Sequence, residues 1–241
     1  MNTIRTCSIA VLALVSAVTI KAQTADEIIA KHIDALGGKD KLGQINSVYI
    51  ESSTEVMGNE APTKVYVLNG KNYRMESDFG GQTMVQVASD KNGWAIMPFG
   101  GSSDPAALTD DQFKQIVDNI YLADPLTNYA ANGAKVELQG QEKVGNVNAY
   151  KIKYTNKYGT ETTYYLDPSS YYIIQSVRQG QVMGQDVTVT TTYSNYTKTD
   201  FGVFMPYTVN IDMGQFAMTG NTKKVEVNKD IDPKIFDMPS K

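Results

Sequence analysis

The residues that could perform acid, base or nucleophilic chemistry are few and scattered. His32 is the single histidine, and it falls on the apolar side of an expected helix, where a histidine is more often a boundary residue than a catalyst. A serine nucleophile would need Ser102 or Ser103 to meet it, and no spacing in the sequence brings them together. Without a visible nucleophile–base pair we expect no catalytic residue and no enzyme activity.

Paired acids and glycine-rich segments have simpler explanations than catalysis. Asp110 and Asp111 stand where acidic side chains favour a helix N-terminus, and Asp230 and Asp232 suit a turn. The Gly100–Ser103 stretch lacks the lysine and the following helix of a phosphate-binding loop. One histidine and one cysteine are too few for almost every zinc, haem or iron–sulfur site. We therefore expect no metal and no cofactor.

The charge and composition exclude further classes of protein. The 241 residues hold 22 Lys and Arg against 26 Asp and Glu, a formal charge of −4, and the pI is about 5.1. Nucleic-acid binding needs a basic face, so we expect no nucleic-acid partner. A content of 41% hydrophobic and 20% charged residues excludes a disordered chain and a coiled coil. No linker interrupts the sequence, and we expect one domain over residues 23–241.

The first 22 residues have the pattern of a secretory signal peptide. Arg5 precedes an apolar run from Ser8 to Ile20 that is too short to span a bilayer. Ala22 then offers a small residue for cleavage. We expect a cut after Ala22 and export to the periplasm, where the protein could associate with the outer membrane. Because Cys7 precedes the apolar run, we expect no lipid at Cys7.

Helical signals occur at the start of the remaining chain and near its middle. Thr24–Glu27 has the spacing of a capping box, apolar residues follow at helical spacing, and Gly37 ends the pattern. This predicts a helix of about three turns. A second, shorter helix is expected after Thr109. A third is expected over Leu126–Asn132, after Asp124-Pro125.

The rest of the sequence alternates with a period of two. Alternating runs occupy Asn46–Phe99 and resume near residue 135, separated by Asn-Gly and Gly-Gly turns that are typical of hairpins. A sheet of about 11 antiparallel strands should curl, and its apolar face must be covered. The expected fold is therefore mainly β (α+β), a strongly curved antiparallel sheet or unclosed barrel. The N-terminal helix and two lid-like helices are expected on its concave side.

The apolar residues of the early strands and of the first lid-like helix are expected to face each other across that concave side. A spacing of two places the apolar residues of each strand on one face of the sheet. Helical spacing places those of the helix on one side of it. The helix is expected to rest against the sheet near Trp94, with the Gly100-Gly101 loop allowing it to move. The candidate ligand-binding residues are Val48, Ile50, Tyr73, Met75, Trp94, Ile96, Phe113, Ile116, Val117 and Ile120.

Two segments resemble the outer-membrane lipoprotein-sorting family, the LolA/LolB-like periplasmic lipoprotein carriers. Asp90–Pro98 (DKNGWAIMP) is similar to the family's D-G-K-x-x-W-x-Y-x-P strand, although no tyrosine stands between Trp94 and Pro98. The segment from Ala25 to Gly38 is similar to the start of secreted relatives, and the order of elements matches over most of residues 23–241. This resemblance implies an unclosed barrel with a helical lid over an apolar cavity that holds acyl chains.

The resemblance also has a departure. Well-studied carriers fasten the lid with an arginine on an early strand, whereas the corresponding stretch here, Leu68–Lys71, offers Asn69. Arg74 is close by in the sequence, but nothing fixes which way it faces.

Three classes of function follow from these observations. The leading hypothesis is a non-enzymatic periplasmic carrier or sensor, which would bind acyl chains of a lipid or an acylated lipoprotein as a monomer. In the family this binding serves outer-membrane lipoprotein sorting, with outer-membrane components as partners. The alternative is a secreted binding or scaffold module whose barrel is filled by its own side chains. An enzyme is the third and least supported class. A deep cavity, a filled barrel and converging polar groups would distinguish the three.

Overall fold

A computed structural model describes residues 23–56, 58–98, 103–122, 124–182 and 185–239 of the protein. The expected signal peptide at residues 1–22, with Cys7, lies outside the described residues, and so does the Gly100-Gly101 loop. Within the described ranges, no helix combines the length and the apolar character needed to cross a bilayer.

The described strands form one antiparallel sheet that does not close. Its order is β6-β5-β4-β3-β2-β1-β13-β12-β11-β10-β9-β8-β7, so β1 and β13 join the N-terminal strands to the C-terminal ones. The mainly β fold is as expected, and the 13 strands exceed the estimate of about 11. The strands are β1 (Ser47–Val56), β2 (Asn59–Leu68), β3 (Asn72–Phe79), β4 (Gln82–Ser89), β5 (Gly93–Ile96), β6 (Ala106–Ala107), β7 (Lys135–Val144), β8 (Val147–Thr155), β9 (Glu161–Leu166), β10 (Ile173–Val182), β11 (Gln185–Lys198), β12 (Phe204–Asp212) and β13 (Ala217–Val227).

The first two expected helices form where the capping signals predicted them, whereas the third, expected over Leu126–Asn132, is only a 3₁₀ turn. Helix α1 (Ala25–Leu36) begins with a capping box made by Thr24 and Glu27. A second capping box, made by Thr109 and Gln112, opens α3 (Asp110–Ile116). The helix then tightens into the 3₁₀ turn η2 (Val117–Ile120). The remaining helical elements are α2 (Lys39–Leu42), η3 (Pro125–Asn128) and η4 (Pro233–Phe236).

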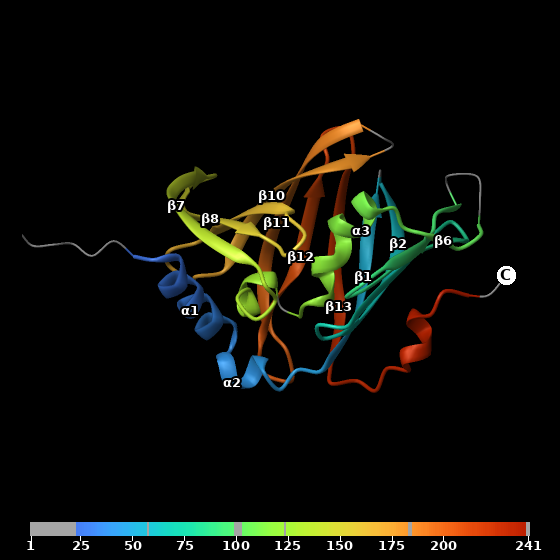
Figure 1. Ribbon diagram of the computed structural model, residues 1–241, viewed down its shortest axis with the longest axis horizontal. Coiled ribbons are helices and arrows are strands. Elements are labelled where there is room, and N and C mark those ends of the chain that lie inside the picture. The colour runs from blue at the N-terminus through green and yellow to red at the C-terminus, as the bar shows by residue number, and fades with distance from the viewer. Residues whose placement is uncertain (1–22, 57, 99–102, 123, 183–184, 240–241) are drawn as a thin grey trace, which may run out of the picture.

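Two clusters of buried side chains hold helices against the concave face of the sheet. In the N-terminal core, Phe113, Val117 and Ile120 of α3 and η2 pack with apolar side chains of β1–β4. In the C-terminal core, Ile28 and Ile29 of α1 pack with side chains of β8 to β10 and of η3. Figure 1 shows α1 beside β7 and β8, with α3 over the other half of the sheet.

A third cluster lies on the opposite, convex face and corrects the expected position of Trp94. Tyr73 pairs with Ala88, whereas Trp94 pairs with Val87, the next residue of β4, so Trp94 points away from Tyr73. Trp94 and Ile96 pack there with Val85, Val87, Ile231 and Phe236. The prediction that Trp94 and Ile96 share the concave face was therefore wrong, and so was the contact between α3 and the sheet near Trp94.

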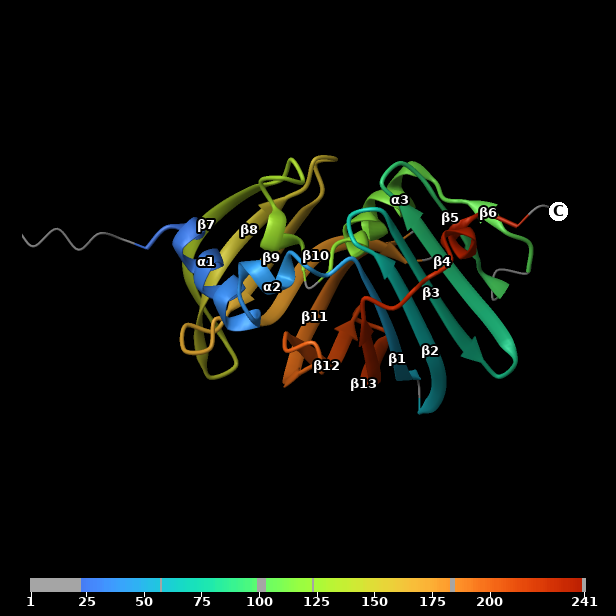
Figure 2. The same ribbon diagram turned by 90° about the horizontal axis from the view of Figure 1, so that it is seen from below.

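The convex cluster exists because the C-terminal segment covers that end of the sheet. The Trp94 indole Nε1–H donates to the Phe236 carbonyl at 2.9 Å, and the Arg74 Nη1 donates to the Ile235 carbonyl at 2.7 Å. The Arg74 guanidinium also lies 5.5 Å from the centre of the Trp94 ring. Figures 1 and 2 show η4 at the β4–β5 end of the sheet, well away from α1.

Replacing Trp94 by Phe should loosen this C-terminal segment. The variant keeps an aromatic ring but leaves the buried Phe236 carbonyl without its donor, which should lower the free energy of unfolding by about 1–2 kcal/mol. Urea-induced unfolding measures this loss, and faster trypsin cleavage after Lys234 should accompany it. Unchanged stability with Lys234 still protected would contradict the placement of Trp94.

Candidate functional site

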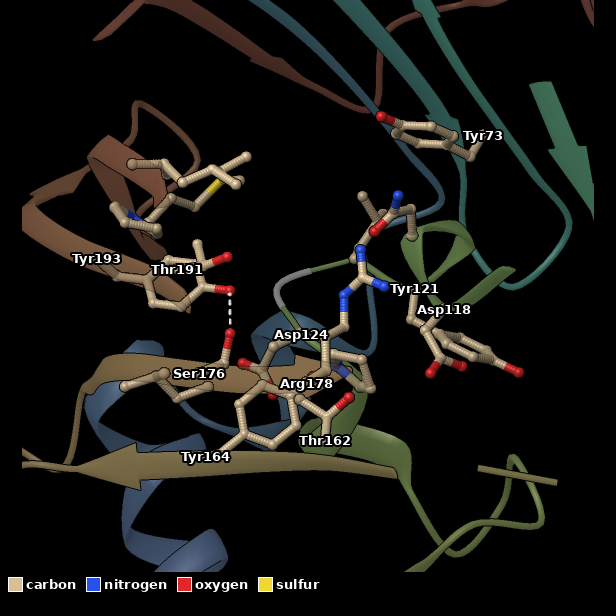
Figure 3. Close-up of a pocket in the computed structure, with 18 of the residues that line it drawn as sticks. Tyr73, Asp118, Tyr121, Asp124, Thr162, Tyr164, Ser176, Arg178, Thr191 and Tyr193 are labelled. Atoms are coloured by element: carbon tan, nitrogen blue, oxygen red, sulfur yellow. Dashed lines mark hydrogen bonds between the residues drawn. The ribbon is translucent and has the colours of Figure 1, made fainter. Parts of the chain in front are cut away.

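A cavity of about 430 Å³ lies on the concave face, between the two cores. Its volume falls within the range of about 300–1,000 Å³ that is common for small-molecule sites. The early strands contribute Ile50 and Tyr73, and the strands from β9 to β12 form the opposite wall (Figure 3). The helical segment between them supplies the third side. The barrel is therefore not filled by its own side chains at this point.

The wall formed by β9–β12 is apolar along one side and polar along the other. Val189, Val209 and Ile211 lie on the apolar side. The polar side chains come mainly from β9, β10 and β11, and the Ser176 and Tyr193 hydroxyls are hydrogen-bonded at 3.1 Å (Figure 3). The apolar and polar groups that line this wall are Thr162, Tyr164, Ile173, Ser176, Arg178, Val189, Thr191, Tyr193, Tyr196, Phe204, Met205, Pro206, Val209 and Ile211.

The candidate ligand-binding residues divide into three groups in the structure. Ile50 and Tyr73 line the cavity. Trp94 and Ile96 lie on the convex face, as described above. The other six pack within or against the N-terminal core between α3, η2 and the sheet, beside the cavity rather than in its lining: Val48, Met75, Phe113, Ile116, Val117 and Ile120.

Helix α3 and η2 contact the cavity with their other side. Lys114, Gln115, Asp118 and Asn119 line it, while the apolar side of the same segment is packed on β2–β4. The segment was expected to cover a ligand with its apolar face. Instead that face is occupied by the sheet, and polar side chains face the space.

Asn69 holds the end of this helical segment. The Asn69 Oδ1 accepts from the Leu122 backbone N–H at 3.3 Å, and its Nδ2 donates to the Ile45 carbonyl at 3.0 Å. The Gly70 N–H donates to the Ile120 carbonyl at 2.9 Å. Arg74 contributes nothing here because it faces the convex side. The β2–β3 turn therefore fixes η2 through an amide and a backbone group.

Arg178 is the most unusual group in the cavity lining. Its guanidinium extends from β10 into the cavity, between Asp118 and Tyr121 on one side and Ser176 and Tyr193 on the other (Figure 3). Its Nη1 is buried without a hydrogen-bond partner. Burial lowers the pKa of Arg178 from its ordinary value, which nevertheless leaves it a cation. An unsatisfied buried donor of this kind costs about 1–3 kcal/mol or more when charged.

Asp118 faces the same space but is already engaged. The Asn156 Nδ2 donates to it at 3.0 Å, and the Tyr154 hydroxyl lies 3.4 Å from its other oxygen. Burial raises the pKa of Asp118, while these hydrogen bonds and the charge of Arg178 oppose the rise. Among the ion pairs of the described residues, none joins Asp118 to Arg178.

His32, which is fully buried, pairs with Asp124, which lines the cavity. The His32 Nε2 lies 2.8 Å from the Asp124 Oδ2, and its Nδ1 lies 2.7 Å from the Tyr171 carbonyl oxygen. A carbonyl can only accept, so Nδ1 must donate, and the carboxylate favours a proton on Nε2 as well. Burial opposes the positive charge, but Asp124 and the Tyr171 carbonyl outweigh it and raise the pKa of His32.

The sequence predicted that His32 lies at the boundary of the apolar face of its helix. Through this pair, His32 has a structural role as well. The His32 side chain is completely buried, and it ties α1 to Asp124, whose other oxygen caps η3 through the Leu126 N–H. A serine does not take part in the contacts of the ring. Within the described residues, no group of three His, Cys, Asp or Glu side chains could hold a metal ion.

A β-bulge explains why the sequence pattern did not reveal Arg178. In β10 the register shifts between Ile173 and Gln175, so that Ile173 and then Ser176 and Arg178 face the concave side. A strict period of two from Ile173 would place Gln175 and Val177 there instead. Nothing in the residue types marks this shift.

The His32–Asp124 pair predicts a loss of stability at alkaline pH. Because the folded pKa of His32 is raised above 6.5, its stabilisation is complete below about pH 6.5 and is lost as the pH rises through the folded value. The midpoint of urea unfolding should therefore fall between pH 6 and pH 9. In His32→Gln this fall should be much smaller, and at pH 6 the variant should be about 3 kcal/mol less stable, as for a broken buried pair. Parallel pH profiles would contradict the assignment.

Comparisons of sequence identify no relatives of this chain. No protein-family model matches it, and no curated protein matches it significantly.

Comparisons of structure do identify similar proteins. A LolA superfamily protein from Nitrosomonas europaea is 15% identical, with a TM-score of 0.60, covering 90% of this chain and 98% of that one. A DUF1329 family protein from Desulfovibrio piger is 13% identical, with a TM-score of 0.59 and coverages of 88% and 96%. An outer-membrane lipoprotein-sorting protein domain from Vibrio parahaemolyticus is 11% identical, with a TM-score of 0.56 and coverages of 87% and 94%. The chain therefore shares its fold with these three proteins, at sequence identities of 11–15%.

Proposed function

We propose that the protein is a non-enzymatic carrier or sensor that holds the acyl chain of a lipid or a lipoprotein in the concave cavity. The observation that carries this proposal is the cavity itself, about 430 Å³ of space between the helical segment and β9–β12. Apolar side chains of β11 and β12 line one side of it, and burying each methylene of a ligand there would contribute about 0.8 kcal/mol.

The chemistry of the lining supports binding rather than catalysis. The described residues around the cavity include no histidine and no cysteine, and the Ser176 hydroxyl is bonded to the Tyr193 hydroxyl rather than to a base. The fold supports the same reading, because it is shared with a protein domain of outer-membrane lipoprotein sorting. Export to the periplasm, without a lipid at Cys7, completes the proposal.

The volume also favours a small cargo. It lies near the lower end of the usual range for small-molecule sites, which favours one chain over a ligand with several. Larger cargo would require α3 and η2 to leave the N-terminal core, which would expose Phe113, Val117 and Ile120. We therefore propose that a single chain enters the existing space without that movement.

Filling the cavity provides the test. Val209 of β12 lines the space, and Val209→Trp should occupy it with an indole ring. The neutral fluorescent probe N-phenyl-1-naphthylamine should bind the wild-type protein, and the variant should bind it at least about ten-fold more weakly, the equivalent of about 1.4 kcal/mol. Far-UV circular dichroism should remain unchanged.

Asn210→Trp is the matched control, because the neighbouring residue is exposed and its side chain points to the other face of β12. This variant should bind the probe as the wild-type protein does. Equal probe binding by all three proteins would place the ligand elsewhere, and the absence of any binding by the wild-type protein would favour the scaffold alternative.

A further inference from the structure

Resting on the proposed function, we infer that the cavity selects a single-chain amphiphile with an anionic head group, and that Arg178 binds the head group. The chemical class is a carboxylate or a phosphate ester on one hydrocarbon chain. The juxtaposition that carries this inference is an unpartnered guanidinium directly beside an apolar wall, inside one cavity.

The charges around the cavity leave room for one anion. Asp124 is matched by the buried His32, with 2.8 Å between the nitrogen and the oxygen. Asp118 remains as one negative charge, held by Asn156 and Tyr154. Against it stand two cations, Arg178 and Lys114, neither of which takes part in an ion pair of the described residues. The lining therefore carries an excess of positive charge, to which Lys157 near Asp118 adds, and an anionic ligand would offset it.

The position of Arg178 in the sheet separates a head-group site from a chain site. Its neighbours across the sheet are Thr162 on β9 and Val189 on β11. In the adjacent row, Ser176 is paired with Thr191, which is paired in turn with Ile211 of β12. Polar groups therefore surround the guanidinium toward β9 and β10, and the lining becomes apolar toward β12.

The geometry of the guanidinium suits this role. An arginine presents a planar set of donors that matches the oxygens of a carboxylate or a phosphate, and hydrogen bonds in which both partners are charged are roughly twice as strong as neutral ones. No hydrogen bond of the described residues engages the buried Nη1 group, so it could turn toward an anion in the cavity without giving up an internal acceptor.

The test compares ligands that differ only in the head group. Dodecanoate, dodecyl phosphate and dodecan-1-ol would compete with N-phenyl-1-naphthylamine at pH 6, where His32 keeps its charge, and below their micelle concentrations. Wild-type protein should bind at least one of the two anions about ten-fold more tightly than the alcohol. Whichever anion binds more tightly identifies the head-group chemistry. Inorganic phosphate binding as tightly as dodecyl phosphate would overturn the inference, because the chain would then contribute nothing.

Substitution of the arginine completes the test. Arg178→Met should bind dodecan-1-ol as the wild-type protein does and should lose the preference for the anion, whereas Arg178→Lys should keep part of it. The thermal midpoint of Arg178→Met should stay the same or rise, because Nη1 has no internal partner to lose. A large fall in that midpoint would show that the guanidinium is structural and would overturn the inference.

The two proposals fail in different ways. If the wild-type protein binds neither the probe nor any of the three dodecyl compounds, the carrier function itself is wrong. If the alcohol binds as tightly as both anions, the cavity holds a chain but Arg178 does not select the head group.

Discussion

The structure depends on one constraint: a long apolar sheet face has to be covered by very little helix. Helix α1 and η3 cover the strands at the C-terminal end of the sheet, and α3 with η2 covers the N-terminal strands. Each helical group is just large enough to complete a core of its own. The strands between these two cores receive no full cover, and the cavity lies there. The cavity is thus a result of this shortage of helix.

Where the two helical groups meet, polar contacts replace apolar packing. The His32–Asp124 pair fixes α1 to the start of η3, and the Asn69 side chain fixes the segment that leaves η2. The two contacts hold Leu122 and Asp124, both of which line the cavity. The shape of the cavity is therefore set by directional hydrogen bonds, which specify one geometry more sharply than interchangeable apolar contacts would.

The fold was predictable because its sequence signals lie in neighbouring residues. Much of the site was not predictable, since the residues that determine it lie far apart in the sequence. Capping boxes and turn residues identified the helices and hairpins directly from neighbouring positions. The face occupied by Trp94 depended on a C-terminal segment more than 130 residues away that covers the convex side. Arg178 faces the cavity only because of a bulge near Ile174, and the burial of His32 depends on Asp124. A period of two shows that the side chains of a strand alternate between two faces. Where both faces of the sheet are covered, it does not show which side chains point to which face.

The pairing of β1 with β13 also has a consequence for how the chain folds. Val48 is paired with Val227, so β1 finds one of its two neighbours, the central strand β13, only after all the other strands have been made. Closing such a long loop carries an entropic cost that must be met before the contacts form, and non-local pairing of this kind slows folding. Until β13 arrives, both β1 and β12 present unpaired strand edges that can associate with other chains. Slow folding and a need for protection from aggregation are therefore built into the topology.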